Sequence, residues 1–391
     1  MKISSIRKFK KLDQQTVFLR VDFNVPLAAG KIKEDYKIRA GLASLEFLLA
    51  RGARLLVATH LGEPSGRQPA LSTKPLAARL KTLLKRPVKF SPEAIGPKVL
   101  AAAKKIKPGE VLMLENLRFY PGEYANDAVF AKALAAPADI YVNDAFAVCH
   151  RAQASVSAIK KYLPSYAGLL LEQEIGALNK VLKPRKPLVV IMGGAKVATK
   201  APLISKLYPA ASQILIGGAL ANNFFSFQKW ETGKSLVDKG SAASIAKFYK
   251  GKKLVPKIIL PPDVVVKTAG GEARVKAPAA VKSTEKILDI GPKTISLYAD
   301  YIKKAQTLVW NGPFGKFEEN SFKHGTLAIA RLIASRSSGR AYGVVGGGET
   351  VEALKLTKMA EYVDWISTAG GAMLSYLGGD KLPGLKGIIK N

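Results

Sequence analysis

The chain has 391 residues, 48% of them hydrophobic, and its mean hydropathy is slightly positive at +0.07. This composition excludes a disordered chain, and the length predicts two domains, each large enough to bury a core. The formal net charge is +32. Because the lysines and arginines are scattered along the chain, without a zinc-finger or RNA-binding signature, they favour a solvated basic surface over a specific nucleic-acid site.

Two features of the sequence bear on location. A lone cysteine, Cys149, cannot form an intrachain disulfide, and the first sixteen residues lack the apolar core and cleavage site of a secretory signal, so we expect a cytoplasmic protein. Residues 208–228 carry no charge over about the length of a membrane span, but proline, glycine and asparagine interrupt them. They predict a buried strand, a glycine-rich turn and a helix start, and no membrane contact.

Short apolar, β-branched runs alternate with helix-like stretches along the whole chain, which predicts βα units and parallel sheets. In chain order the predicted strands are Val17–Val25, Arg54–His60, Val111–Phe119, Ile140–Phe146, Leu188–Met192, Gln213–Ile216, Lys257–Leu260, Thr307–Trp310, Tyr342–Val345 and Val363–Ile366.

The residues that follow these runs differ between the two halves. Parallel sheets bind ligands at the carboxyl ends of their strands. First-half strands end in charged or amide side chains, which suit a small anion: Asp22, Asn24, His60, Asn116, Arg118, Asn143, Asp144, His150 and Arg151. Second-half strands end in glycine-rich turns at residues 193–194, 217–218, 312, 346–348 and 370–371, which suit the phosphates of a nucleotide. The pattern predicts phosphoryl transfer between an anionic metabolite and a nucleotide.

Residues 168–182 read as one helix between the proline-bearing segments around Pro164 and Pro187. We interpret this helix as a connector between domains, with an ordinary surface helix as the alternative. The last residues, 378–391, lack helical periodicity and are expected to dock elsewhere on the chain.

Several common motifs are missing. The glycine fingerprint of dinucleotide-binding proteins is incomplete, because position 351 is Val351, and a Walker A loop ending at Gly233 would need a glycine where Gln228 stands. Three histidines and one cysteine are too few for a zinc site, whereas magnesium bound by one carboxylate and substrate phosphates stays open. Cys149 beside His150 is interpreted as a buried structural thiol rather than a nucleophile.

Lys196 and Lys200 lie four residues apart at the start of a predicted helix, directly after a Gly-Gly turn. Residues at this spacing share one helix face, so both ammonium groups could reach one phosphate chain. A solvated helix face is the alternative.

Ten segments resemble, in order, the signature segments of phosphoglycerate kinases, and together they span nearly the whole chain. They are VFLRVDFNVPL (17–27), DYKIRA (35–40), THLGEPSG (59–66), LENLRFYPGE (114–123), NDAFAVCHRAQAS (143–155), MGGAKVATK (192–200), IGGALANNF (216–224), VWNGPFGKFE (309–318), GGGETVEAL (346–354) and STAGGAMLSYLGG (367–379).

The resemblance implies an α/β fold with two Rossmann-like domains whose parallel sheets face each other across a cleft. Residues 1–167 would form an N-terminal phosphoglycerate-binding domain, to which residues 373–391 return. Residues 168–183 would form a hinge helix and residues 184–372 a nucleotide-binding domain.

The reaction implied is reversible phosphoryl transfer from 1,3-bisphosphoglycerate to ADP, giving 3-phosphoglycerate and ATP in glycolysis and gluconeogenesis, with Mg²⁺ bound to the nucleotide. By matching positions, the phosphoglycerate would be held by Asp22, Asn24, Arg39, His60, Arg118 and Arg151. The nucleotide would be held by Gly194, Lys196, Lys200, Gly217, Asn311, Pro313, Glu318, Gly346, Gly347, Gly348 and Thr350, with Glu349 reaching the metal. We assign Arg39 and Lys196 to the transferring phosphoryl group, and expect a monomer without a specific nucleic-acid partner.

Several positions depart from the family pattern. Glu63 replaces a substrate-facing arginine, and Arg67 nearby is a candidate to compensate. Glu349 and Thr199 stand where the family has aspartates, Gln153 where it has a histidine, and Ala147 and Ala369 where it has glycines. These departures leave open a second hypothesis, a non-catalytic relative that binds nucleotides or polyanions. A dinucleotide oxidoreductase is disfavoured by the missing fingerprint.

Overall fold

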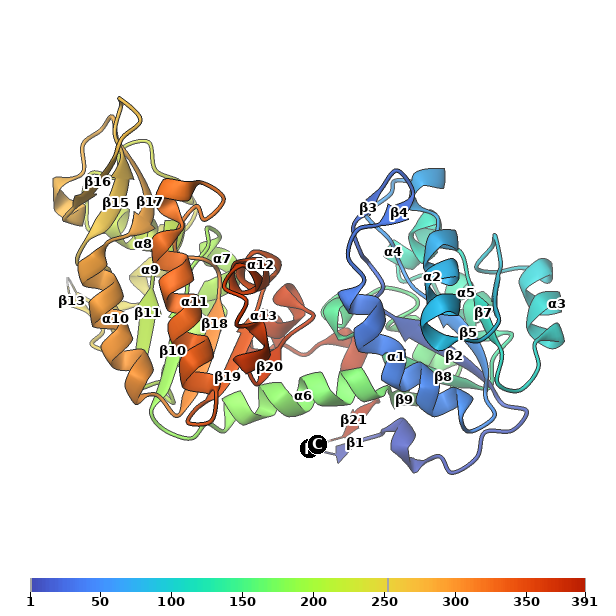
Figure 1. Cartoon of the computed structure of the whole chain (residues 1–391). Coiled ribbons are helices and arrows are strands. Elements are labelled where there is room, and N and C mark those ends of the chain that lie inside the picture. Colours follow the sequence, from blue (N-terminus) through green and yellow to red (C-terminus); the bar gives the residue numbers. More distant parts are fainter. Residues whose placement is uncertain (1, 252, 391) are drawn as a thin grey trace. The chain divides into compact units, whose positions relative to one another are not determined.

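The computed structural model describes residues 2–251 and 253–390. The chain divides into two compact units. Unit 1 extends to Gly176 and takes in the C-terminal segment from Lys381, and unit 2 is Ala177–Asp380. Helix α6 (Leu169–Leu182) contains the division, at the place where the sequence predicts a single connecting helix (Figure 1).

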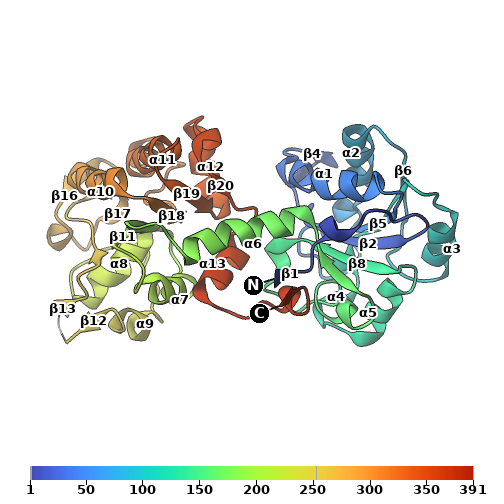
Figure 2. The same ribbon diagram turned by 90° about the horizontal axis from the view of Figure 1, so that it is seen from below.

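Unit 1 is built on a six-stranded sheet whose strands all pair in parallel. In spatial order the strands are β6 (Val88–Phe90), β7 (Val111–Met113), β5 (Arg54–Ala58), β2 (Thr16–Val21), β8 (Ile140–Asp144) and β9 (Ser165–Ala167). Helices α1 (Tyr36–Leu49) and α2 (Lys74–Leu84) cover one face, and α4 (Pro121–Tyr124) and α5 (Ala128–Ala135) cover the other (Figure 2). All six residues of β2 are buried, as expected for a strand covered on both faces.

The remaining elements of unit 1 lie around this sheet. They are α3 (Pro97–Lys105), the hairpin of β3 (Leu27–Ala28) with β4 (Lys31–Ile32), and the pair of β1 (Lys2–Ile3) with β21 (Ile389–Lys390), which joins the two ends of the chain. The sequence predicts a returning segment from residue 373, whereas the compact unit takes up the chain from Lys381.

Unit 2 repeats the plan with a second six-stranded parallel sheet. Its strands are, in spatial order, β14 (Ile258–Ile259), β11 (Gln213–Ile216), β10 (Leu188–Met192), β18 (Thr307–Asn311), β19 (Tyr342–Gly346) and β20 (Trp365–Ile366). Helices α7 (Val197–Leu207), α8 (Gly218–Phe227) and α9 (Ala242–Ala246) lie on one face, and α10 (Pro292–Lys304), α11 (His324–Ser337) and α12 (Gly348–Leu356) on the other (Figure 2). Helix α13 (Gly370–Gly378) packs against α7.

A smaller antiparallel sheet extends unit 2 and is missing from the sequence prediction. It consists of β16 (Ala273–Lys276), β15 (Val264–Lys267) and β17 (Lys286–Ile290), and a separate hairpin pairs β12 (Tyr249–Lys250) with β13 (Lys253–Leu254). The strands of this sheet carry lysines and, in β16, exposed residues, so they lack the continuous apolar character that marks the parallel strands.

Several predicted strands end earlier in the structure. The run from Val17 leaves the sheet after Val21, and the run from Val111 ends at Met113, followed by a 3₁₀ turn at Leu117–Phe119. Strand β20 is shorter than predicted, at Trp365–Ile366. The polar residues at these ends bond to loops instead of the sheet, as when the Asn116 side chain accepts from the Arg118 N–H.

The uncharged segment 208–228 forms β11 and then α8, as predicted. No described helix has both the length and the apolar character needed to cross a membrane.

Candidate functional site

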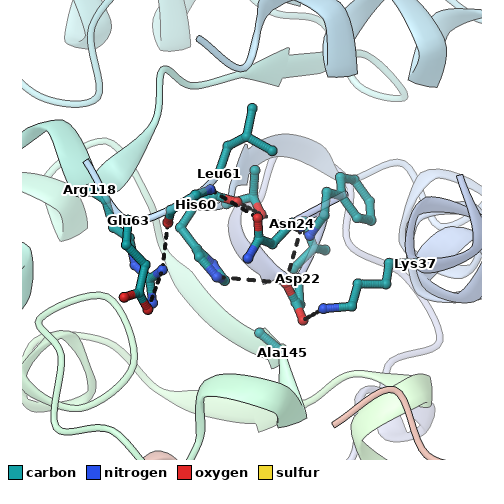
Figure 3. Close-up of polar contacts among 12 residues, drawn as sticks. Asp22, Asn24, Lys37, His60, Leu61, Glu63, Arg118 and Ala145 are labelled. Carbon is teal, nitrogen blue, oxygen red and sulfur yellow. Dashed lines mark hydrogen bonds and ion pairs between the residues drawn. The ribbon is translucent and has the colours of Figure 1, made fainter. Parts of the chain in front are cut away.

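The carboxyl end of β2 in unit 1 carries a buried carboxylate, Asp22. The Lys37 ammonium on α1 donates to its Oδ2 at 2.8 Å, and the backbone N–H of Asn24 donates to its Oδ1 at 3.2 Å. Burial opposes ionisation of Asp22, but the Lys37 charge and these hydrogen bonds outweigh it and hold the pKa of Asp22 below its ordinary value. Figure 3 shows Lys37 and His60 on either side of this carboxylate.

His60 follows β5 and is buried beside Asp22, with its Nε2 3.9 Å from Oδ1. Burial and the neighbouring Arg20, Arg118 and Lys37 lower its pKa well below the ordinary value, so the ring is neutral at pH 7. Because the Arg20 guanidinium lies 3.2 Å from Nδ1 and can only donate, Nδ1 is the acceptor and the proton resides on Nε2.

Arg20 was not anticipated from the sequence, although a charged residue inside an apolar strand is a recognisable signal. It is completely buried. Its Nε donates to the Ser155 hydroxyl at 2.8 Å, and its Nη2 lies 4.0 Å from the Glu123 carboxylate, which also accepts from the Ser155 N–H and hydroxyl. This network holds the guanidinium against His60.

Two amide side chains position the loop after β5. Asn24 Oδ1 accepts from the Gly62 N–H at 2.9 Å, and Asn116 exchanges hydrogen bonds with both the N–H and the carbonyl of Leu61. The carbonyl of Gly62 in turn accepts from Arg118 Nη1 at 2.7 Å. The loop therefore fixes a buried guanidinium at the end of the sheet.

Glu63 joins two of the predicted substrate-binding arginines. Its Oε1 lies 2.9 Å from Arg151 Nη1 and 3.5 Å from Arg118 Nη1 (Figure 3 draws the contact with Arg118). Arg67 bonds to the Pro92 carbonyl and the Glu93 carboxylate instead.

Arg39 lies on the exposed side of α1 and donates to Asp35 Oδ1 at 2.8 Å, while Arg79 holds the other oxygen of Asp35. Within the described contacts, Arg39 joins neither Asp22 nor His60. Of the six predicted phosphoglycerate residues, the structure brings Asp22, Asn24 and His60 together and connects Arg118 to Arg151 through Glu63.

In unit 2 a cavity of about 310 Å³ lies at the carboxyl ends of the strands. Three of the predicted nucleotide-binding residues line it, Gly194, Pro313 and Glu318, together with Glu349, which is predicted to reach the metal. The turn after β10 packs closely on the loop after β18, because a side chain at Gly193 would lie 2.2 Å from the Pro313 carbonyl oxygen. The same carbonyl accepts from the Gly194 N–H at 2.9 Å.

The two predicted phosphate lysines differ in environment. Lys196 is the exposed residue just before α7. Lys200, one turn on, is buried and donates to Asn311 Oδ1. Burial lowers the pKa of Lys200 to about 8, with Glu349 partly opposing the shift.

The other predicted nucleotide residues organise the loops around the cavity. Asn311 donates to the Gly346 carbonyl at 2.7 Å, and the Thr350 hydroxyl accepts from the Gly312 N–H at 2.7 Å. Gly217 precedes α8 and donates to the Met192 carbonyl, whereas Gly347, with φ of 102°, precedes α12, which begins at Gly348. These backbone turns leave N–H groups at two helix starts, where anions are favoured.

Asp289 at the end of β17 also lines the cavity and was missed by the sequence analysis. It accepts from the Gly325 and Ile290 N–H groups, yet burial raises its pKa to about 7. Among the described residues, no three His, Cys, Asp or Glu side chains cluster into a group able to hold a metal ion.

The two parallel-sheet units, one lined by basic side chains and the other by glycine turns around a cavity, define a two-unit α/β enzyme of the phosphotransferase class. The family model described as phosphoglycerate kinase matches residues 6–380. The chain belongs to the phosphoglycerate kinase family, and its activity is that of a kinase.

Relatives and solved structures agree with this membership. The chain is 44% identical to the phosphoglycerate kinase of Moorella thermoacetica over 97% of this chain and 98% of that protein, and 43% identical to that of Thermomicrobium roseum over 97% and 98%. It is similar to the structures of phosphoglycerate kinase from Coxiella burnetii (TM-score 0.85, 36% identity, 99% of each chain) and Pyrococcus horikoshii (TM-score 0.85, 32% identity, 98% of each chain).

Proposed function

We propose that, in the reversible phosphoryl transfer from 1,3-bisphosphoglycerate to ADP that this kinase catalyses, the phosphoglycerate binds to unit 1 and the nucleotide to unit 2. The observation that carries this assignment is the difference between the two sheets. The carboxyl ends of the strands in unit 1 carry a buried, neutral His60 with basic side chains around it. Those of unit 2 carry glycine turns around a cavity.

In unit 1, Arg118 and Arg151 supply guanidinium groups that suit phosphate oxygens. His60 keeps its proton on Nε2 and can donate it to an anionic substrate, since Arg20 occupies the other nitrogen. Asp22 holds Lys37, and Asn24 holds the loop whose Gly62 carbonyl accepts from Arg118. Asp22 and Asn24 therefore orient the cations, as well as being predicted to contact the substrate themselves.

In unit 2, the N–H groups at the starts of α7, α8 and α12, which follow the turns at Gly194, Gly217 and Gly347, suit the phosphates of ADP or ATP. The cavity wall from Pro313 to Glu318 suits the nucleoside. Lys200 adds a buried positive charge near Glu349. The exposed Lys196 is free to move toward the transferring group.

Catalysis of this transfer requires alignment and charge neutralisation rather than covalent chemistry, because an acyl phosphate is already a good phosphoryl donor. We assign Arg39 and Lys196 to the charge that develops on the transferring group. Since the two ligands bind to separate units, the transfer requires the two ligands to be brought into line, and α6 is the proposed hinge.

Glu349 fits magnesium bound to a nucleotide. It presents one exposed carboxylate on the cavity wall, at the first turn of α12, and one carboxylate together with phosphate oxygens is the usual magnesium environment. When bound, magnesium would neutralise phosphate charge. The monomeric state, the lack of a specific nucleic-acid partner and the cytoplasmic location stay predictions from the sequence.

A coupled assay tests the proposal. Purified protein is given ATP, magnesium and 3-phosphoglycerate, and 1,3-bisphosphoglycerate is followed through its NADH-dependent reduction. We expect turnover, and a loss of about 100-fold or more in kcat for Arg39→Ala. A folded protein that binds ATP without turnover would instead support the non-catalytic alternative.

A further inference from the structure

Glu63 places a carboxylate oxygen where an anionic ligand is expected to bind. The same oxygen, Oε1, contacts both the Arg151 and the Arg118 guanidinium groups. A phosphate oxygen makes the same kind of contact with paired guanidinium groups, with similar geometry. Carboxylate and phosphate would repel each other at this short range, so both cannot occupy the position together.

Arg118 does not depend on Glu63 for its position. The Gly62 carbonyl accepts from its Nη1 at 2.7 Å, and the ring of Tyr124 lies 5.5 Å from its guanidinium carbon. The side chain is only 2% exposed, whereas that of Glu63 is 65% exposed. The arginine is therefore held by the fold, while the glutamate is free to turn into water.

Arg118 also has unused donor capacity. Its Nε is buried and has no hydrogen-bond partner among the residues that the structure describes. A buried N–H without an acceptor is costly, and a ligand oxygen could satisfy it. Arg151, by contrast, is 41% exposed and makes its ion pair with Glu63.

We propose that Glu63 is a built-in competitor: it occupies the phosphate-binding position between Arg118 and Arg151 and must turn away before phosphoglycerate binds. This inference rests on the proposed function of unit 1. Glu63 then lowers the affinity for the substrate, and its removal should strengthen binding. Removal of a positioning residue would weaken binding instead.

With Glu63 present, the protein binds phosphoglycerate more weakly, while the phosphoryl-transfer step is unchanged. Displacing Glu63 breaks its ion pairs with Arg118 and with the half-exposed Arg151. Both are replaced by contacts with the phosphate group, which carries more charge than a carboxylate. Without the competitor, phosphoglycerate and inorganic phosphate should bind more tightly by a similar factor, because both present the same phosphate group to the arginines.

The experiment measures binding of inorganic phosphate and of 3-phosphoglycerate to wild type and Glu63→Gln by titration calorimetry at low salt. We expect both dissociation constants to fall about fivefold in the variant, equivalent to about 1 kcal/mol of lost competition. Asp13→Asn is the matched control, because it removes one negative charge of unit 1 from an exposed pair with Lys11 and should leave both constants unchanged.

A second substitution localises the effect. Adding Arg151→Met to Glu63→Gln should abolish the gain if it arises at this pair. Unchanged affinity in Glu63→Gln would overturn the inference, and weaker binding would make Glu63 a positioning residue instead. The coupled assay of the wild type separates the competitor proposal from the proposed function. If the wild type turns over and Glu63→Gln binds phosphate with unchanged affinity, only the competitor role of Glu63 is rejected. If Glu63→Gln binds phosphate more tightly and the wild type shows no turnover, only the kinase reaction is rejected.

Discussion

The ammonium group of Lys200 lies against the side-chain oxygen of Asn311, and the amide nitrogen of the same asparagine donates to the Gly346 carbonyl. One side chain thus connects the first turn of α7 with the ends of β18 and β19. This lysine is buried, and none of the described carboxylates lies at hydrogen-bond distance from it, so burial lowers its pKa to about 8. Its charge is consequently sensitive to mildly alkaline pH.

We expect ATP to bind more weakly as the pH rises through 8. The cation that faces the phosphates is lost in the free enzyme above its pKa, so the dissociation constant should rise by up to about tenfold between pH 7.5 and pH 9. Lys200→Met should bind ATP more weakly at pH 7.5 and show little further change. Calorimetry at both pH values checks this, and an equally steep profile in Lys200→Met would assign the titration to another group.

Lys196 differs from Lys200 in being exposed, which suits a side chain that acts on the transferring group rather than in ground-state binding. Lys196→Met should reduce kcat by about 100-fold or more and change the ATP dissociation constant by less than about threefold. Steady-state kinetics combined with direct ATP titration separate the two effects. Equal losses in both would make Lys196 a binding residue.

The core of each sheet could be predicted from the sequence, because strands covered on both faces are continuous apolar runs. Strands β10 and β11 have the predicted bounds, and the predicted connecting helix is α6. The ends of strands such as β2 and β7 could not be placed, because the polar residues that follow them turn away to bond with loops, as Asn116 does. The antiparallel sheet around β15 was missed because its strands mix lysines with apolar residues.

The candidate site was predictable in its residue types but not in their pairing. The pattern of polar strand ends identified Asp22 and His60, yet the partners that set their ionisation, Lys37 and Arg20, come from a helix and a strand interior. The contact of Glu63 with Arg151 joins positions 88 residues apart. Spacing along the chain carries no signal for such a contact, since it depends on how the strand ends meet in the folded sheet.

The buried network of Arg20 should matter for stability as well as for His60. Replacing Arg20 with methionine keeps the volume but leaves the Glu123 carboxylate buried without its cation, so we expect a loss of about 3–5 kcal/mol in the free energy of unfolding. Arg7→Met, which removes an exposed ion pair to Glu172, should cost less than about 1 kcal/mol. Urea denaturation measures the free energy of unfolding of both variants, and hydrogen exchange in β2 shows whether the loss lies in unit 1. Equal losses in the two variants would show that the buried network contributes no more than a surface ion pair.

Asp144 at the end of β8 provides a pH dependence whose sign can be worked out. Its Oδ1 accepts from the Leu171 N–H in the first turn of α6, and burial raises its pKa from 3.8 to about 6. The folded state therefore holds this proton more tightly than the unfolded state between pH 4 and 6. The stabilising contribution of the protonated carboxyl is present below pH 4 and is lost as the pH rises to 6.

Asparagine at this position should remove that dependence. The second oxygen of Asp144 has no hydrogen-bond partner among the residues described, so an amide group fits there without meeting a donor. We expect Asp144→Asn to be more stable than the wild type by about 1–3 kcal/mol at pH 7.5 and to lose this advantage at pH 4. Urea denaturation at the two pH values measures the difference. A constant gap between variant and wild type would mean that Asp144 does not titrate in this range.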